Sequence, residues 1–321
     1  MSAPRILITG ATGFVGRMLV ATLPPDELRL ALRGARNPWR QIASTVVGDL
    51  GAATDWSSAV EGIDCVIHLA ARVHVMNPGP DDQRLFDDVN VQATRRLIEA
   101  AAGAGAKRFI QLSSIKVNGE ATAHDAAFHP DDPPRPLDEY GRSKWRAEQC
   151  IFEVAAKHGI EALAIRSPLV YGPEVRANFL RLMQLVYRGV PLPLGAVNNR
   201  RSMISVWNLC DLLVSAARAK QTGSGVLMAS DGEDISTAQL IRYLAKAMSR
   251  PARLLPVPPT LLNLMGRLTG KQAEVSRLIG SLRVDSSVTQ SRLKWRPPVS
   301  VEEGIERTAR WFVANRDAHG S

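Results

Sequence analysis

The stretch Arg5-Ile-Leu-Ile-Thr-Gly-Ala-Thr-Gly-Phe-Val-Gly16 decides the fold of this chain. Its apolar run, residues 6–8, is typical of a buried parallel strand, and residues 14–23 predict an amphipathic helix. Glycines at this spacing allow a tight turn and let a pyrophosphate approach the amides of a helix N-terminus. This first strand–turn–helix unit therefore predicts a dinucleotide-binding site. We expect cofactor contacts from Gly10, Thr12, Gly13, Phe14, Val15 and Gly16.

Size and composition indicate an ordinary globular protein. The chain has 321 residues, of which 45% are hydrophobic and 22% charged, enough for one large or two modest domains. The cysteines Cys65, Cys150 and Cys210 show no paired spacing, which argues against a disulfide framework or a zinc site. We therefore expect a cytoplasmic protein without a metal site. The N-terminus shows no signal-peptide pattern, and no apolar run of about 18 residues predicts a membrane span.

The net charge of +9 restricts the class of partner. Basic residues gather in small clusters, at positions 33–40 and at Arg200 and Arg201, and no basic helix with interleaved aromatics occurs. We therefore expect no nucleic-acid partner. Phosphate groups on a cofactor and on a substrate account for the clusters more simply.

The first half of the chain alternates between strand and helix patterns. We predict strands at 6–8, 28–32, 44–47, 65–69, 108–112 and 163–165, with helices at 14–23, 56–61, 84–102 and 139–157. Short apolar strands separated by helices predict an α/β fold with a doubly wound parallel sheet. In such a sheet the ligand crevice lies at the C-terminal ends of the strands.

Prolines interrupt this pattern after about residue 166. We expect a dinucleotide-binding domain at 1–166 and a smaller, mostly helical substrate lobe at 167–321, with later segments, about 202–230, returning to the first domain. Within that region, 202–206 and 226–229 are candidate strands of the first sheet. We predict helices of the lobe at 177–187, 209–219, 237–248, 261–268 and 301–315.

Two polar patterns lie where this crevice is expected. Tyr140 and Lys144 are four residues apart, on one face of the predicted helix, and a nearby ammonium lowers the pKa of a phenol. Ser113 and Ser114 follow a predicted central strand, so a hydroxyl there can bind a substrate oxygen. Each pattern alone also fits a solvated helix face or a polar loop.

Together these residues resemble the extended short-chain dehydrogenases/reductases, specifically the NAD-dependent epimerase/dehydratase family. The resemblance spans nearly the whole chain and rests on Gly10-x-x-Gly13-x-x-Gly16, Asp49-Leu50, His68-Leu-Ala-Ala71, Asn90-Val-Gln-Ala-Thr94, Ser113-Ser114, Tyr140-x-x-x-Lys144, Tyr171-Gly-Pro173 and Leu293-Lys-Trp295. It implies a Rossmann-type sheet, a nicotinamide cofactor and a homodimer formed through the helices at 84–102 and 139–157.

The resemblance also implies roles for individual residues. It makes Tyr140 the acid/base, Ser114 the catalytic serine with Ser113 as the alternative, and Lys144 the lysine that binds the ribose. It places Asp49 at the adenine edge, gives Asn90 a structural role beneath the site, and puts Ala70 and Ala71 beside the nicotinamide ribose. Leu50 and Leu69 are further expected cofactor contacts.

The predicted second strand indicates which nucleotide is used. It ends in Arg33, with Arg36 close behind, where NAD-preferring relatives carry an acidic residue. Because an arginine suits a 2′-phosphate, we expect NADP(H), with NAD as the alternative.

On the substrate side, Asn178 resembles a donor to a nucleotide-sugar diphosphate, and Arg201 resembles an arginine that neutralises phosphate. Leu169 departs from the family, since many epimerases carry a substrate-contacting asparagine there. The sequences at residues 71–76 and 113–120 resemble those of a bacterial surface-polysaccharide (O-antigen) subgroup. Some members of that subgroup use polyprenyl-diphosphate sugars. The apolar stretch 254–268 is compatible with approach to a membrane, although a core helix is the favoured interpretation.

These expectations lead to an NADP(H)-dependent reductase acting on a 4-keto hexose diphosphate, a nucleotide- or polyprenyl-linked 4-keto-6-deoxy amino sugar. Tyr140 would protonate the oxygen, Ser114 would polarise it, and Lys144 would hold the ribose. The first alternative is a 4-epimerase of UDP-glucose or UDP-GlcNAc type, which uses the same residues and keeps its nucleotide. An alternative of another class is a non-catalytic NADP-sensing regulator.

Overall fold

The computed structural model describes residues 4–73 and 82–316. The large sheet consists of β1 (Ile6–Thr9), β2 (Leu28–Leu32), β3 (Ala43–Val46), β4 (Cys65–His68), β5 (Arg108–Ser114), β6 (Glu161–Ser167) and β9 (Gly225–Met228). Two further strands, β7 (Leu169–Tyr171) and β8 (Met203–Ser205), form a separate two-stranded sheet.

The helices, in chain order, surround these sheets. They are α1 (Phe14–Thr22), α2 (Ser57–Val60), α3 (Asp82–Asp87), α4 (Ala93–Gly103), α5 (Glu139–His158), α6 (Ala177–Tyr187), α7 (Val206–Arg218), α8 (Thr237–Ala247), α9 (Pro259–Leu268), α10 (Gln272–Ile279), α11 (Ser287–Leu293) and α12 (Val301–Ala314). Short 3₁₀ turns occur at Pro25–Glu27 and Ile115–Val117, and a π-helical turn occurs at Asp88–Gln92.

The large sheet is parallel and doubly wound, with strand order β3-β2-β1-β4-β5-β6-β9. The chain runs outward from β1 to β3 and then returns to the other side of β1 with β4. This reversal opens a crevice between the C-terminal ends of β1 and β4, the usual ligand position in open α/β sheets. The predicted α/β fold with a doubly wound sheet is confirmed.

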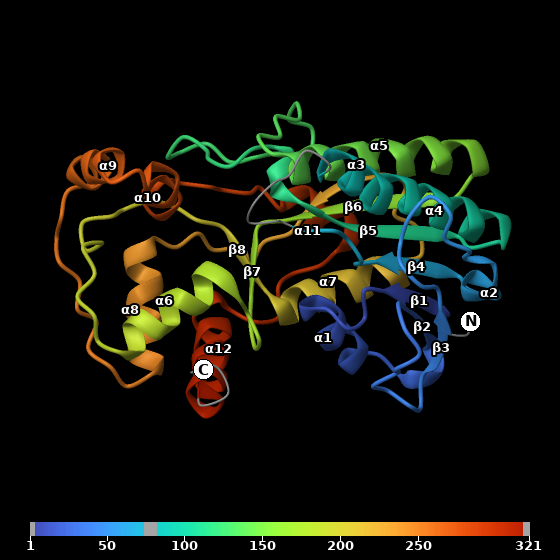
Figure 1. Ribbon diagram of the computed structural model, residues 1–321, viewed down its shortest axis with the longest axis horizontal. Coiled ribbons are helices and arrows are strands. Elements are labelled where there is room, and N and C mark those ends of the chain that lie inside the picture. The colour runs from blue at the N-terminus through green and yellow to red at the C-terminus, as the bar shows by residue number, and fades with distance from the viewer. Residues whose placement is uncertain (1–3, 74–81, 317–321) are drawn as a thin grey trace.

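The two faces of the sheet bury different side chains, because successive residues of a strand point to opposite sides. In β1, Ile6 and Ile8 pack into the core shared with α1 and α7, whereas Leu7 packs into the core shared with α4 and α5. Figure 1 shows α1 and α7 on one face of the sheet and α4 and α5 on the other. Both faces are therefore covered, which explains why the strands are apolar throughout.

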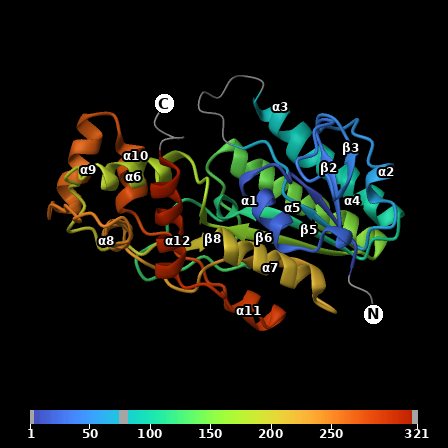
Figure 2. The ribbon, with the colours of Figure 1, turned by 90° about the horizontal axis from the view of Figure 1, so that it is seen from below.

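The remaining helices build a second lobe with its own core, which includes Phe179 of α6, Leu244 of α8 and Ile305 of α12. Figures 1 and 2 place this lobe beyond the C-terminal ends of the central strands. Within the described residues, none of the helices combines the length and apolar composition that crossing a bilayer requires.

Some local predictions need correction. The segment 226–229 does return to the large sheet, as β9 beside β6, but 202–206 does not, because β8 pairs with β7 in the small sheet. The helix predicted at 84–102 is interrupted by the π-helical turn Asp88–Gln92. The helices α10 and α11 were not predicted.

Candidate functional site

The glycine turn fits tightly between two strands. Gly10 has φ +71°, and a Cβ atom there would lie 2.7 Å from the backbone nitrogen of Ala70, just after β4. A Cβ on Gly16 would lie 2.2 Å from the carbonyl oxygen of Gly10. Only glycine fits either position, because both contacts are with backbone atoms.

The start of α1 has the features of an anion site. Gly13 is the N-cap residue, and no side chain caps the helix. The first amides of an α-helix have no partner within the helix, so those at Phe14 and Val15 can donate to an anion. With the backbone of Ala70 directly beside Gly10, these residues fit the pyrophosphate of a dinucleotide.

A buried histidine connects β1 and β4 to the helix beyond. The Thr94 hydroxyl donates a hydrogen bond to the Asn90 carbonyl oxygen (2.8 Å), so its oxygen accepts a hydrogen bond from Nε2–H of His68 (3.0 Å). Nδ1 of the neutral ring then accepts from the Thr9 hydroxyl (2.7 Å), which accepts from the Ala70 amide (3.2 Å). The hydrogen bonds thus form two chains that share the ring: the Ala70 amide donates to Thr9 and Thr9 to Nδ1, whereas Nε2 donates to Thr94 and Thr94 to the Asn90 carbonyl oxygen. Burial, with a smaller effect of the nearby lysine, lowers the pKa of His68 to about 3.

The same chain of contacts reaches the tyrosine. The side chain of Asn90, which is 2% exposed, accepts from the Arg72 amide (2.7 Å) and donates to the Ser143 hydroxyl (2.9 Å). Ser143 in turn donates to the carbonyl oxygen of Tyr140 (2.8 Å). Asn90 thus links the segment just after β4 to the first turn of α5.

Asp138 holds the segment just after Ser114 against the start of α5. Asp138 caps α5 by accepting from the Gly141 amide (2.8 Å), and its other oxygen accepts from the Lys116 ammonium just beyond Ser114. A Cβ on Gly141 would lie 2.8 Å from the Lys116 carbonyl oxygen, so glycine allows this close approach. This brings the Ser114 hydroxyl close enough to the Tyr140 phenol to favour its ionised form.

The electrostatics of this pair differ from the expectation. Burial raises the pKa of Tyr140 to about 12, and the nearby Ser114 hydroxyl opposes this only in part. Burial also lowers the pKa of Lys144 to about 8, against the opposing charge of Glu148. The expected lowering of the Tyr140 pKa by Lys144 is therefore absent in this arrangement, because the cost of burying a phenolate dominates.

Lys144 is placed to bind a ligand. It is 3% exposed, and no hydrogen bond from its ammonium is seen within residues 4–73 and 82–316. An ammonium in such a position gains from hydrogen-bond acceptors, which the hydroxyl groups of a bound ribose would supply. This supports the fit of the site to a nicotinamide nucleotide.

Ser113 does not join the other predicted residues. Successive residues of β5 face opposite ways, and the Ser113 hydroxyl donates to Glu148, two helical turns beyond Tyr140 in α5. Glu148 also forms an ion pair with Arg166 of β6 (2.6 Å), and Arg166 donates to Asn118 (2.9 Å). The structure thus gives Ser113 a buried structural contact in place of the predicted substrate contact.

Sequence reasoning missed this buried ion pair, although a signal was present. Glu148 lies four residues after Lys144 and eight after Tyr140, so all three share one face of α5. A carboxylate on the buried face of an amphipathic helix requires a partner, and here the partner is Arg166.

The residues predicted at the adenine end lie together at the surface. Arg33 and Asp49 follow the neighbouring strands β2 and β3 and form an ion pair, with side chains 82% and 77% exposed. Arg36 is exposed nearby in the chain, and Leu50 packs at the edge of the core beneath α4. Arg33 therefore has a carboxylate partner in the place where a 2′-phosphate was expected.

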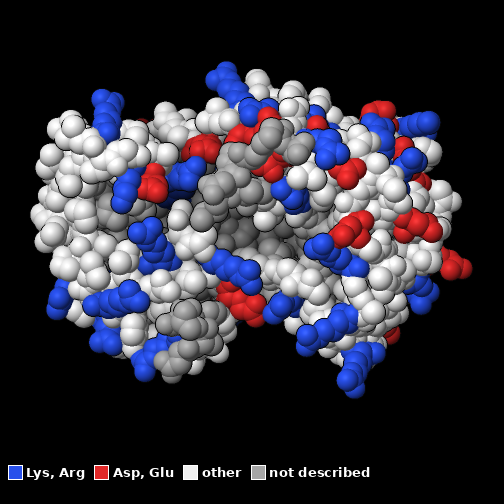
Figure 3. Space-filling view, in the orientation of Figure 1, with Lys and Arg blue, Asp and Glu red and all other residues white. Residues whose placement is uncertain are grey.

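The predicted substrate residues lie in the second lobe. Asn178 is exposed in the first turn of α6, after a segment in which Glu174 and Ala177 have positive φ angles. Arg201 donates to the carbonyl oxygens of Arg277 (2.9 Å) and Gly280 (3.0 Å), and burial lowers its pKa. Leu169 is 44% exposed. The face in Figure 3 is hollowed between the sheet and this lobe, with Lys and Arg side chains on both sides.

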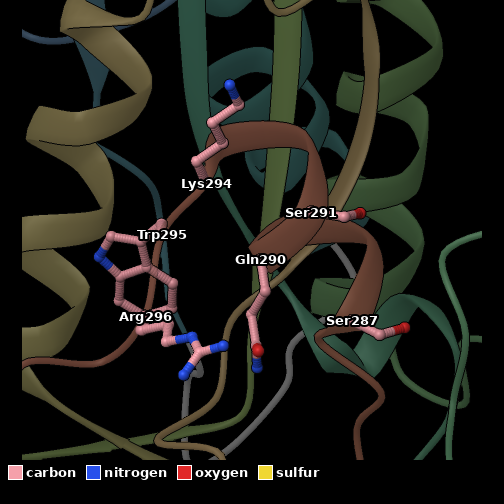
Figure 4. A pocket seen from close by; sticks show the side chains of 6 residues that line it. All are labelled: Ser287, Gln290, Ser291, Lys294, Trp295 and Arg296. Carbon is pink, nitrogen blue, oxygen red and sulfur yellow. The ribbon is translucent and has the colours of Figure 1, made fainter.

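We also searched the described residues for a further cavity and for a metal site. A shallow cavity of about 640 Å³ lies beside α11, as Figure 4 shows, and none of the predicted site residues lines it. Within the described residues, no group of His, Cys, Asp and Glu side chains could hold a metal ion.

Comparisons with known proteins agree with this geometry. Residues 6–228 match the NAD dependent epimerase/dehydratase family. A UDP-glucose 4-epimerase from Vibrio cholerae is 42% identical over 313 residues, which cover 96% of this chain and 95% of the relative. An N-acetyl-alpha-D-glucosaminyl-diphospho-ditrans,octacis-undecaprenol 4-epimerase from Escherichia coli O157:H7 is 28% identical over 321 residues, with 95% and 94% coverage.

Among solved structures, a UDP-glucuronic acid 4-epimerase from Bacillus cereus in complex with NAD superposes with a TM-score of 0.75 at 23% identity, and 97% of both chains is covered. This similarity shows the shared fold. The family match spans more than half of the chain, from β1 through β9, and includes the glycine turn, Ser114, Tyr140 and Lys144. The chain belongs to the NAD-dependent epimerase/dehydratase family and is an NAD(P)-dependent enzyme of the extended short-chain dehydrogenase/reductase type.

Proposed function

We propose that the protein is a 4-epimerase of a hexose linked to a diphosphate and that it keeps its nicotinamide nucleotide bound through the cycle. The observation that carries this proposal is the pair Ser114 and Tyr140 at the crevice of the glycine turn, in a chain 42% identical to a 4-epimerase over nearly its whole length. The sequence alone favoured a 4-keto reductase, and the comparisons move the epimerase to first place.

The nucleotide would lie across the C-terminal ends of β1 and β4. The amides at the start of α1 would hold the pyrophosphate, and Leu69, Ala70 and Ala71 would flank the nicotinamide ribose. Asp49 would face the adenine, and Lys144 would donate to the ribose hydroxyls. When bound, the nicotinamide supplies reversible hydride transfer.

Tyr140 would move the proton of the sugar hydroxyl at carbon 4. It takes the proton as the hydroxyl becomes a carbonyl and returns it once the sugar has presented its other face. Ser114 would orient the same oxygen through its hydroxyl. A phenol with a pKa of about 12 needs its phenolate stabilised for this role, and Lys144, with a pKa of about 8, remains mainly protonated at neutral pH one helical turn away.

The second lobe would bind the diphosphate. Arg201 supplies a half-buried cation that donates to two carbonyl oxygens through one nitrogen, so its other N–H groups suit phosphate oxygens. Asn178, exposed at the start of α6, would add an amide donor. The carrier beyond the diphosphate would be a nucleoside or a polyprenyl chain.

A second candidate is the NADP(H)-dependent reductase of a 4-keto sugar, which the position of Arg33 at the end of β2 favours. Its ion pair with Asp49 would have to yield to a 2′-phosphate. The Arg33→Ala variant separates the alternatives. If NADP is used, affinity for NADPH falls about 10- to 100-fold while affinity for NADH is unchanged. Equal affinities before and after the substitution would contradict a role in nucleotide choice.

The proposed function is tested by incubating the protein with UDP-glucose, with UDP-GlcNAc and with a UDP-4-keto sugar. Product separation by anion-exchange chromatography measures epimerisation, and nicotinamide absorbance measures nucleotide consumption. An epimerase interconverts the 4-hydroxy sugars without consuming nucleotide. Stoichiometric loss of NADPH with the keto sugar alone would instead establish the reductase.

The Tyr140→Phe variant tests the role of the phenol. We expect nucleotide binding to be retained and kcat to fall about 10²- to 10⁴-fold, because the proton relay is lost while the fold is unchanged. Unchanged turnover would refute the role of Tyr140. Absence of turnover in the native enzyme, with nucleotide binding intact, would favour a nucleotide-sensing regulator.

A further inference from the structure

The helix α9 exposes a continuous apolar face. Leu261, Leu264, Met265 and Leu268 are 46%, 52%, 51% and 78% exposed. Their spacing of three and four residues places them on one side of the helix. The sequence favoured a core helix for this stretch, and this expectation is wrong: of the α9 residues, only Leu262 and Gly266 are buried.

This exposure is built into the fold, because the opposite face of α9 is firmly packed. Leu262 belongs to the core of the second lobe. At Gly266, an added Cβ would lie 3.0 Å from Cγ2 of Val275, so glycine lets α10 pack closely against α9. Figures 1 and 2 place α9 at the end of the molecule opposite α2 and β3.

Basic residues lie on and next to α9. Arg267 is on the helix and Lys271 follows it, both exposed, and residues 251–280 add exposed Arg253 and Arg277, the latter paired with Glu120 (3.9 Å), against one acidic residue, Glu274. Figure 3 shows Lys and Arg side chains beside uncharged surface at this end of the molecule. An apolar stripe bordered by cations complements the surface of an anionic lipid bilayer, whose headgroups attract lysine and arginine and whose acyl region accepts leucine.

The same surface connects directly to the predicted diphosphate site. Arg201 donates to carbonyl oxygens of Arg277 and Gly280 at the C-terminal end of α10. Asn199 donates to the carbonyl oxygen of Gly280 as well (2.8 Å). The helix that packs against α9 is therefore anchored by the segment that would hold the phosphates.

We propose that the exposed face of α9, with the basic residues around it, docks the protein on an anionic lipid surface, where it takes a sugar whose diphosphate is carried on a membrane-embedded lipid. The choice of substrate rests on the proposed function, whereas the docking itself does not. Docking at α9 brings the Arg201 end of the lobe toward the bilayer, which is where the diphosphate of a lipid-linked sugar lies.

The docking is tested with the full chain and vesicles, without any sugar substrate. We expect cosedimentation with phosphatidylglycerol/phosphatidylethanolamine vesicles, weaker binding to phosphatidylcholine vesicles, and a loss of affinity as salt rises. The double variant Leu264→Ser/Leu268→Ser should lower vesicle affinity at least about tenfold, because two apolar side chains no longer enter the acyl region. Arg267→Glu/Lys271→Glu should lower it about tenfold or more on anionic vesicles only.

The matched control is Val46→Ser, which removes a 55% exposed apolar side chain at the opposite end and should leave vesicle binding unchanged. Circular dichroism spectra and urea midpoints like those of the native chain confirm that the α9 variants are folded. Absence of binding by the native chain, or equal binding by the Leu264→Ser/Leu268→Ser variant, overturns the inference. A further contradicting result is that the native chain does not bind vesicles and the Leu264→Ser/Leu268→Ser variant has a different oligomeric state in light scattering. The exposed face of α9 would then contact a second copy of the chain.

These outcomes are separable from those for the proposed function. Epimerase activity without vesicle binding refutes the docking alone. Vesicle binding without epimerase activity refutes the proposed function and leaves the docking surface intact.

Discussion

Acidification should destabilise this protein through one residue, His68. In the native state burial keeps its imidazole neutral, with a pKa of about 3, whereas the ordinary value is 6.5. Between these two values the unfolded chain binds a proton that the native state does not, so stability is fully present above pH 6.5 and falls as the pH falls. From pH 7 to pH 5 the loss from this ring amounts to about 2 kcal/mol.

The hydrogen bonds explain why the ring resists protonation. An imidazolium donates from both nitrogens, but Nδ1 faces a Thr9 hydroxyl that donates toward it. A proton on Nδ1 would force the Thr9 hydroxyl to turn its own proton away from the ring, because its oxygen would then accept from both Nδ1 and the Ala70 amide. The Thr9 proton would lose its present acceptor, which adds to the cost of burying the charge.

The assay is urea unfolding at pH 7 and at pH 5, followed by circular dichroism. The native chain should lose about 2 kcal/mol more than the His68→Gln variant over this interval, since glutamine has no proton to gain. A His158→Gln control replaces an exposed histidine at the end of α5 and should behave like the native chain. The reasoning is refuted if native and His68→Gln proteins lose the same free energy.

Other predictions concern the turn and the buried ion pair. Gly10→Ala should abolish measurable nucleotide binding in calorimetry, because both its φ of +71° and its backbone contact exclude a side chain, whereas Gly34→Ala, with no atom within 4 Å of the added Cβ, should bind normally. Arg166→Met should lower the free energy of unfolding by about 3–5 kcal/mol in urea titrations, since Glu148 stays buried without its cation. Arg95→Met at a surface ion pair should cost less than about 1 kcal/mol, and a similar loss in both variants would contradict the argument.

The sequence predicted those parts of the site that depend on local pattern. The glycine turn and the Tyr140–Lys144 spacing follow from backbone geometry within a few residues, and the parallel sheet follows from apolar runs separated by helices. The orientation of Ser113 toward Glu148 was missed because it depends on which face of β5 meets α5. No local pattern specifies that pairing.

The errors in the second lobe have a related cause. The pattern of the candidate strand 202–206 does not specify its partner strand, and here β8 pairs with β7. The apolar stretch of α9 predicts a helix with a hydrophobic side, but not whether other elements cover that side. Partner choice and coverage depend on contacts between distant segments, which periodicity does not encode.

The π-helical turn at Asp88–Gln92 makes a local irregularity essential to the enzyme's geometry. A π turn accommodates one more residue than an α turn, and each residue of an α-helix advances about 100° around the axis. Deleting one residue here would regularise the helix and swing Asn90 away from Ser143 and Arg72, which it now bridges. A version of this scaffold redesigned with straight, uniform helices would keep its core and lose the alignment of its tyrosine.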